Sequence, residues 1–311
     1  MSRSFWMGVT CALALAACQQ QPANPSAQNS ATCADAHADP ATRVVACDAL
    51  LASSDTSQAD RIDAQAHRGA AHRAAGDVTP ALRDFEAVLR ADANNAEALE
   101  GRAEILLASG QLDAVEPLAD RLIAANAHLD TANQMKGDIA LARGDFAGAI
   151  AFYNTALQHN GHLPIALAHR GRAKQRLDDD LGALADYNAA IAMEPTLSEP
   201  RSGRCWLNLK RNQNLDIALT DAETAVAADP RNAEAQMCRG VLQLRGEEWP
   251  QARASFDAAL VVEPGNPIAL FGRGVARRRG GDGDGSQDMN QARDFDHHIG
   301  EQFDHLGVTT Y

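Results

Sequence analysis

A small residue recurs at an almost fixed interval through the chain, and a basic residue precedes it every time. The interval is 34 residues, except for one step of 35 between Cys205 and Gly240. The small residues are Gly69, Ala103, Gly137, Gly171, Cys205, Gly240 and Gly274. The basic residues are Arg68, Arg102, Lys136, Arg170, Arg204, Arg239 and Arg273. A period of this length is typical of a repeat protein, in which each unit buries its apolar face against its neighbours.

One unit, from Pro164 to Leu197, predicts two amphipathic helices joined by a turn. Gly171 lies where the first helix must contact the second. Three residues at spacing i, i+4 and i+7 share one face of the second helix: Ala183, Tyr187 and Ala190. Pro195 then ends the unit, because proline cannot continue a helix. The repeating element is therefore a helix-turn-helix.

The second-helix pattern recurs as Ala81/Phe85/Val88, Ala149/Tyr153/Ala156 and Ala252/Phe256/Ala259, and it is degenerate in repeat two. A proline closes several units, at Pro195, Pro230 and Pro264. On these residues the chain resembles the tetratricopeptide repeat (TPR) family across residues 62–285. The resemblance implies an all-α fold, a right-handed α-solenoid of stacked helix-turn-helix repeats. We expect about six full repeats and a partial seventh.

Composition and charge fit this class and exclude others. The 311 residues are 45% hydrophobic but only 5% aromatic, which favours close-packed small helices over one large globular core. With 28 Lys and Arg against 41 Asp and Glu, the net charge is −13. Binding to nucleic acid needs clustered basic residues, so nucleic acid is excluded as a partner.

The N-terminus predicts export. Residues 1–17 contain an apolar run from Phe5 to Ala17, too short for the roughly 20 residues that span a bilayer, and we interpret it as a signal peptide. Leu15 to Cys18 resembles the bacterial lipobox, which implies a lipid on Cys18 that anchors the chain in the bilayer. Gln19 after the cysteine implies an outer-membrane lipoprotein facing the periplasm. Ordinary secretion after cleavage at a small residue is the alternative.

The next two segments are predicted to be a tether and a cap. Residues 18–32 are polar, without apolar period, and predict a flexible tether. Residues 33–61 predict an N-terminal cap built on one helix, from Arg43 to Leu51. An oxidising compartment favours a disulfide between Cys33 and Cys47, with two buried free thiols as the alternative.

The two cysteines within the repeats are not expected to pair. Cys205 occupies the small-residue position of its repeat, and Cys238 precedes Gly240 by two residues. We expect both to be free thiols packed as small hydrophobic side chains.

The C-terminal segment, residues 286–311, predicts a capping helix and tail over the last exposed repeat face. His297, Glu301 and His305 follow one another at i, i+4 and i+8 on that helix, and could hold a metal. A glycine- and aspartate-rich turn with Asp282 and Asp284 comes before it but lacks the calcium-loop pattern. Binding of a metal or small ligand by this cluster is the alternative function. We favour a solvated helix face, with no metal and no cofactor.

The seven basic residues are predicted to be a structural ladder. An arginine at this position can bury its stem and extend its guanidinium group to an acid. Asp84, Asp186 and Asp221 follow their arginines by sixteen or seventeen positions, and predict ion pairs such as Arg170 with Asp186. Repeats two, three and six lack this acid, so their bases are expected to contact carbonyls at a helix C-terminus. A binding ladder for an anion is the alternative.

In the TPR family the concave face is built mainly by first helices. By offset, this face is acidic in the early repeats, at Asp63, Glu97, Glu100, Glu104 and Asp138. It is apolar in the later ones, at Trp206, Met237, Val241, Phe271 and Val275. The pattern predicts a partner-binding groove for a segment with a basic end and apolar anchors, unless several of these residues are core.

The sequence carries no catalytic motif of a hydrolase, zinc protease, P-loop protein or dinucleotide-binding enzyme. It therefore predicts a non-catalytic scaffold that binds another protein or peptide segment in the bacterial cell envelope.

Overall fold

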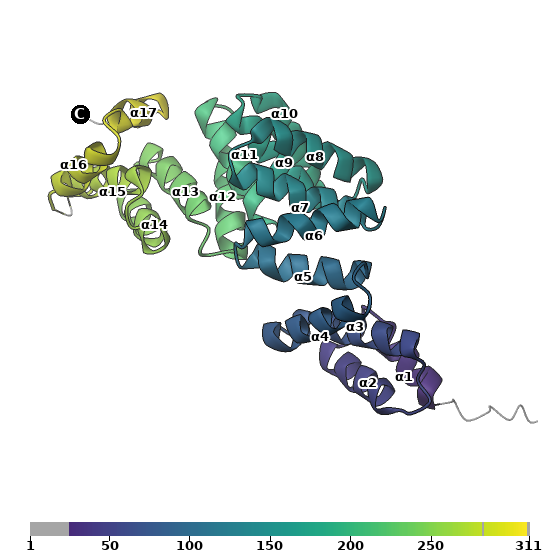
Figure 1. Ribbon diagram of the computed structural model, residues 1–311. Helices are drawn as coiled ribbons and strands as arrows, with labels where there is room; N and C mark the ends of the chain where they lie inside the picture. Colours follow the sequence, from purple (N-terminus) through teal and green to yellow (C-terminus); the bar gives the residue numbers. More distant parts are fainter. Residues whose placement is uncertain (1–24, 282, 310–311) are drawn as a thin grey trace, which may run out of the picture. The chain divides into compact units, whose positions relative to one another are not determined.

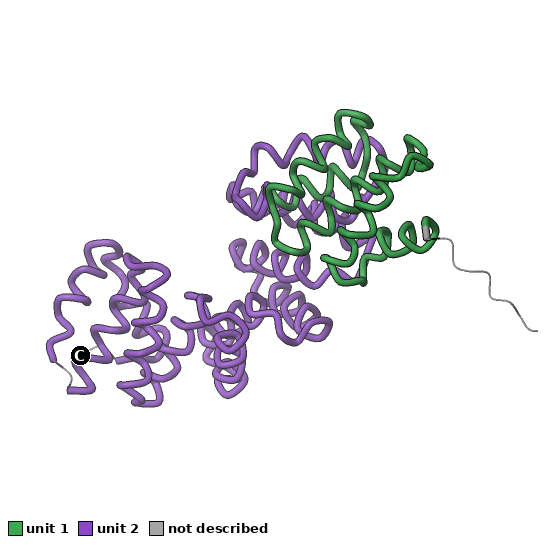
Figure 2. The backbone as a smooth tube through the Cα atoms, turned by 90° about the horizontal axis from the view of Figure 1, so that it is seen from below, with its two compact units in different colours: residues 1–105 green, residues 106–311 purple. Residues whose placement is uncertain are grey.

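A computed structural model describes residues 25–281 and 283–309, and over these residues it has seventeen helices and no strand (Figure 1). The predicted all-α class is confirmed. The chain divides into two compact units, residues 1–105 and 106–311, with the boundary inside helix α5, Ala96–Ala108 (Figure 2). The predicted signal peptide and Cys18 lie outside the described residues. None of the described helices is long and apolar enough to cross a bilayer.

The first unit begins with a helix that the sequence interpretation placed in the tether. Four helices precede α5: α1 Pro25–Ala34, α2 Pro40–Ala52, α3 Gln58–Ala74 and α4 Val78–Ala91. The predicted tether is therefore wrong from Pro25 onwards, and the cap is a helix pair. The predicted disulfide is present and joins Cys33 of α1 to Cys47 of α2, with Cα atoms 4.9 Å apart. This link, together with contacts to Leu50 and Ala64, holds a polar helix that has little apolar surface of its own.

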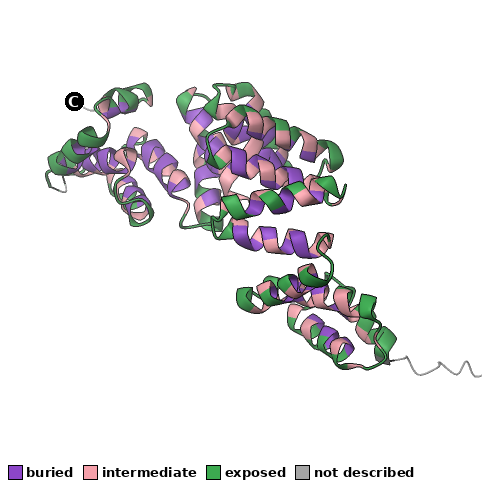
Figure 3. Ribbon diagram, in the orientation of Figure 1, coloured by how far each residue is buried: buried purple, intermediate pink, exposed green. Residues whose placement is uncertain are grey.

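The second unit continues the stack of helix pairs. Its helices after α5 are α6 Leu112–Ala124, α7 Leu129–Ala142, α8 Phe146–His159, α9 Pro164–Arg176, α10 Asp180–Met193, α11 Ser198–Lys210, α12 Leu215–Ala228, α13 Ala233–Arg245, α14 Trp249–Val262, α15 Pro267–Arg279, α16 Ser286–Phe295 and α17 Ile299–His305. Each odd-numbered helix from α7 to α15 packs against the even-numbered helix that follows it. Figure 3 shows the buried residues on the sides of the helices that face one another.

The C-terminal end differs from the prediction of one capping helix. Helix α16 packs on α15 and completes a seventh pair, so only α17 is left as a cap. The single helix is interrupted at Asp296, whose backbone is extended and whose carboxylate accepts a hydrogen bond from the His298 N–H at 2.9 Å. This turn lets Phe303 of α17 fold back onto Phe271 of α15, with ring centroids 4.9 Å apart.

Aromatic side chains explain why the small residue recurs. Tyr187 of α10 is buried between Gly171 of α9 and Gly203 of α11. A Cβ atom at Gly171 would lie 2.8 Å from the Tyr187 ring, and one at Gly203 would overlap the same ring from the other side. Phe256 is held in the same way by Gly240 and Gly272. Each ring thus packs between the first helices of its own repeat and of the next.

Repeat five has no aromatic residue at its ring position, and a buried cysteine stands on the first helix of this repeat and on the first helix of the next. Ala222 stands at the ring position, while Cys205 of α11 and Cys238 of α13 are fully buried. They form a disulfide with Cα atoms 6.4 Å apart, so the prediction of two free thiols is wrong. They lie 33 positions apart, two short of the 35-residue step between these repeats, on the neighbouring first helices α11 and α13, which pack against each other.

Candidate functional site

The basic ladder lies between helices. Arg170 of α9 donates from Nε and Nη2 to the two carboxylate oxygens of Asp186 on α10, at 2.8 and 2.6 Å. Its Nη1 donates to Asn154 of α8 at 2.7 Å. One guanidinium group therefore joins three helices, and the carboxylate that it meets is buried.

The predicted pairs are present at the other repeats that carry the acid. Ion pairs join Arg68 to Asp84 and Arg204 to Asp221, as predicted, and a further pair that was not predicted joins Arg273 to Asp288. Each arginine also contacts a side chain of the preceding helix pair: Asp48 for Arg68, Asn188 for Arg204 and Asp257 for Arg273. These guanidinium groups are occupied by the protein itself, which supports the structural interpretation over an anion-binding ladder.

The expectation for the repeats without the acid is wrong in repeats three and six. Lys136 pairs with Asp120 of α6 and lies 5.5 Å from the centroid of the Phe152 ring, which stands at the acid's position. Arg239 donates to the Ser255 hydroxyl at 3.0 Å and to a side-chain oxygen of Gln236 at 2.7 Å. Side chains of neighbouring helices are within reach, so neither base needs a helix C-terminal carbonyl. In repeat two, where Arg102 is the base, Leu118 stands at the acid's position.

A second set of charges runs across the first helices of the second unit. His169 of α9 contacts Asp138 of α7 at 2.6 Å through Nδ1 and Glu199 of α11 at 3.1 Å through Nε2. Arg172, also on α9, contacts Glu199 at 3.0 Å and Glu234 of α13 at 3.4 Å. Four consecutive first helices are thus linked by charges of alternating sign.

His169 carries a positive charge in this arrangement. Burial lowers its pKa, but the hydrogen bonds to Asp138 and Glu199 outweigh burial and raise the pKa of His169 to about 10. Burial raises the pKa of Glu199, and the hydrogen bond and charge of His169 bring it below the ordinary value.

The repeat before His169 also departs from the packing of a ring between two glycines, because His169 stands where the second glycine would be. Tyr153 faces His169 edge-on at 6.0 Å, whereas Phe85, Tyr187 and Phe256 face a glycine of the next repeat.

We call the five linked side chains the charged line: Asp138, His169, Glu199, Arg172 and Glu234. Its last acid, Glu234, lines a groove of about 660 Å³ at the C-terminal end of the second unit. Its lining residues come from first helices, from the end of α14 and from α17: Gln175, Trp206, Lys210, Glu234, Met237, Glu263, Ile268, Gln302, His305 and Leu306. Trp206 donates from Nε1 to the backbone carbonyl of Glu234 at 3.0 Å, which fixes the indole against α13. We term its apolar lining residues, Trp206, Met237, Ile268 and Leu306, the floor of the groove, and its charged lining residues, Lys210, Glu234 and Glu263, the rim.

The structure places only part of the predicted groove residues in this site. Trp206 and Met237 line it, whereas Val241, Phe271 and Val275 are core residues. The position of Phe271 within its repeat could not show that α17 covers this side chain. The interpretation missed Glu234, Ile268 and Leu306. Glu234 could have been found, because it stands one 35-residue step after Glu199.

The predicted acids mostly lie in the first unit and are partnered or buried there. Glu97 lies 3.4 Å from His67, and Glu104 lies 3.0 Å from Arg73. Burial raises the pKa of both Glu97 and Glu104. Glu100 contributes to the same cluster of charge, since it raises the pKa of both carboxyl groups further. Asp63 lines a separate hollow of about 250 Å³ beside Cys33 and His67.

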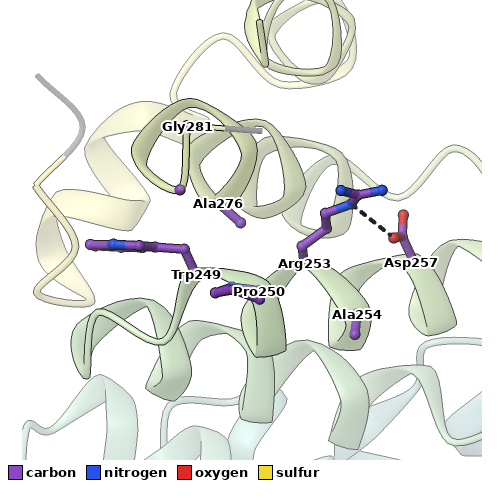
Figure 4. Close-up of a pocket in the computed structure, with 8 residues that line it drawn as sticks. Trp249, Pro250, Arg253, Ala254, Asp257, Ala276 and Gly281 are labelled. Carbon is purple, nitrogen blue, oxygen red and sulfur yellow. Dashed lines mark ion pairs between the residues drawn. The ribbon is translucent and has the colours of Figure 1, made fainter. Parts of the chain in front are cut away.

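Another hollow of the second unit, about 520 Å³, lies between α14 and the end of α15 (Figure 4). Trp249 and Pro250 form one side, and Ala276 and Gly281 lie across from them. Arg253 lies within it and contacts Asp257 at 3.5 Å.

The proposed metal-binding stripe does not form. Helix α17 begins at Ile299, so His297 lies in the preceding turn rather than on the face that carries Glu301 and His305. Asp284 accepts hydrogen bonds from the N–H and hydroxyl of Ser286, and Asp282 lies outside the described residues. Over the part of the chain that the structure describes, no three His, Cys, Asp or Glu side chains converge on a metal position.

Comparison with known proteins gives one family. A tetratricopeptide repeat family model matches residues 68–130, 207–259 and 239–293. No curated protein matches the chain significantly.

Several solved structures resemble the chain. The structure of the APC/C hetero-tetramer Cut9–Hcn1 matches with a TM-score of 0.62 and 12% identity, over 76% of this chain and 48% of that one. A tetratricopeptide repeat protein from Parabacteroides merdae ATCC 43184 has a TM-score of 0.49 and 17% identity, covering 79% and 98%. YrrB, described as a TPR protein with an unusual peptide-binding site, has a TM-score of 0.44 and 20% identity, covering 60% and 95%. The Cut9–Hcn1 likeness shows a shared fold of stacked helix pairs.

Proposed function

Because the chain belongs to the tetratricopeptide repeat family, we infer that it is a non-catalytic scaffold that binds another polypeptide through the groove beside Trp206. The groove carries this proposal. Its volume of about 660 Å³ lies within the usual range for ligand sites, and its apolar floor with a charged rim is typical of them. Several successive first helices contribute to it, so a peptide segment can lie across repeats.

We further propose that the protein acts in the bacterial cell envelope, tethered to the outer membrane by a lipid on Cys18 and facing the periplasm. The lipobox resemblance at Leu15 to Cys18 motivates this proposal. The two disulfides support it, because disulfides persist in oxidising compartments and are rare in the cytosol.

Site-specific photo-crosslinking tests the scaffold role. A benzophenone amino acid in place of Trp206 is expected to crosslink to a partner protein in intact cells. The matched control carries the same amino acid in place of Val261, which is 82% exposed on α14 outside the groove. A product that forms from both positions alike, or from neither, would contradict a role for the groove.

Metabolic labelling with a palmitate analogue tests the tether separately. The parent protein is expected to take up the label and to sediment with outer membranes. The Cys18→Ser variant should remain unlabelled and keep its signal peptide. Equal labelling of the variant, or a parent protein found in the cytosol with residues 1–17 intact, would rule out lipid anchoring.

A further inference from the structure

Two acidic side chains face the same groove from neighbouring elements. Glu234 projects from α13, and Glu263 lies at the end of α14. The cation near Glu234 is Arg172, which Glu234 shares with Glu199. Glu263 accepts a hydrogen bond from the neutral Asn266 side chain at 2.7 Å. The rim therefore places two carboxylates close together while the nearest internal cation is engaged by another acid.

The charges around the groove are unbalanced. Asp138, Glu199 and Glu234 share two cations, His169 and Arg172, and Glu263 adds a fourth acid in the groove. Lys210, also on the rim, lies 3.4 Å from Asp180 and 3.7 Å from Asp178, so its charge is already balanced by other acids.

The backbone adds to this negative potential. Glu263 is the C-cap of α14, and the carbonyl end of a helix carries a partial negative charge. Burial raises the pKa of Glu234, Arg172 lowers it, and the charges of Glu199 and Glu263 raise it again. A cation from outside would relieve this repulsion.

The floor beside the two acids is apolar. Trp206 and Met237 lie next to Ile268 and Leu306 in the same groove. The two cysteines of the α11–α13 disulfide are the direct neighbours of Trp206 and Met237 in the chain, so the bond holds this part of the floor in place. An aliphatic side chain fits such a surface, and an indole face also attracts a cation.

We propose that the groove recognises a segment of a partner polypeptide in which a Lys or Arg stands next to an aliphatic residue. The cation lies between Glu234 and Glu263, and the aliphatic side chain packs on Trp206, Met237 and Ile268. This inference rests on the proposed function, because it names the chemistry of the segment that the scaffold binds.

Tryptophan fluorescence of the full mature chain tests the proposal. Trp249→Phe leaves Trp206 as the reporter, since Trp6 belongs to the predicted signal peptide. The probes are three acetylated and amidated hexapeptides that alternate leucine with lysine, leucine with glutamate, and serine with lysine. We expect the leucine–lysine peptide to bind at least about tenfold more tightly than either of the others, and to weaken as salt is added.

Variants separate this proposal from the general function. Glu234→Gln combined with Glu263→Gln is expected to weaken the leucine–lysine peptide by about tenfold or more and to reduce its salt dependence. Glu223→Gln, an exposed acid on α12, is the control and should change nothing. If the double variant binds like the parent, or the glutamate peptide binds as tightly as the lysine peptide, the proposal is overturned. The scaffold function would still stand in that case if the Trp206 crosslink forms, and would fail with it if no crosslink forms.

Discussion

The first helices of the second unit carry charged residues on two faces, and the two faces differ in how those charges are satisfied. On the ladder face, Arg170 and Arg204 meet buried carboxylates at 2.6 to 2.8 Å, together with a side-chain oxygen of the preceding pair. On the groove face, Glu234 of α13 shares one cation, Arg172 of α9, with Glu199 of α11. The same helix type therefore uses charge for cohesion on one face and leaves charge available for a partner on the other.

The largest expected effect is on the ladder face. Asp221 is 1% exposed and accepts from both Arg201 and Arg204, so Asp221→Asn leaves two guanidinium groups without their counter-ion. We expect a loss of about 3–5 kcal/mol in the free energy of unfolding, measured by urea denaturation. Glu234→Gln on the groove face should cost less than about 1 kcal/mol, because that carboxylate is partly exposed. Equal losses would remove the distinction between the faces.

The disulfide between the two repeats that carry the groove gives the next effect. Replacing Cys205 and Cys238 by alanine is expected to lower the free energy of unfolding by about 2–4 kcal/mol, since the bond closes a loop of 33 residues. The same variant should bind the leucine–lysine peptide more weakly, because α11 and α13 carry Trp206 and Met237. If the variant binds the peptide and unfolds in the same way as the oxidised parent, the disulfide does not determine the geometry of the groove.

A smaller loss is expected where a ring packs against the small residue. Gly137→Ala places a Cβ atom 2.5 Å from Tyr153 Cε1, and should destabilise the second unit by about 1–3 kcal/mol through overpacking. Gly161→Ala is the control, since a Cβ atom there would lie 3.9 Å from the backbone carbonyl oxygen of Leu157, at ordinary van der Waals distance. Thermal unfolding of the two variants should therefore separate them, and similar midpoints would argue against ring packing as the reason for the small residue.

The smallest effect depends on pH and concerns the charged line. The pKa of His169 is raised from its ordinary 6.5 to about 10, so its ion pairs contribute fully below about pH 6.5 and are lost as the pH rises towards 10. The contribution should fall steadily as the pH rises within that window, because the folded state keeps a proton there that the unfolded state has lost. We expect the stability difference between the parent and His169→Gln to shrink between pH 7 and pH 9 in denaturant titrations. A constant difference would show that the imidazole is neutral in the folded protein.

Much of the repeat could be predicted from residue spacing because its contacts are local. Arg170 and Asp186 lie sixteen residues apart within one helix pair, and Cys33 and Cys47 lie on adjacent helices. A fixed helix length and turn then determine which side chains meet. The groove could be predicted only in part. Trp206 and Met237 follow the first-helix pattern, but Phe271 follows it equally well and is covered by Phe303.

The sequence by itself determined the helical class, the period of the repeat and the pairing of Arg68, Arg170 and Arg204 with an acid on the second helix of the same repeat. The tertiary structure decided that Cys205 bonds to Cys238, that α1 is a helix, and that α17 covers Phe271 while Leu306 lines the groove. The physical reason is distance along the chain. Contacts within one helix pair follow from local geometry, whereas contacts between neighbouring pairs and at the chain end depend on how the pairs stack.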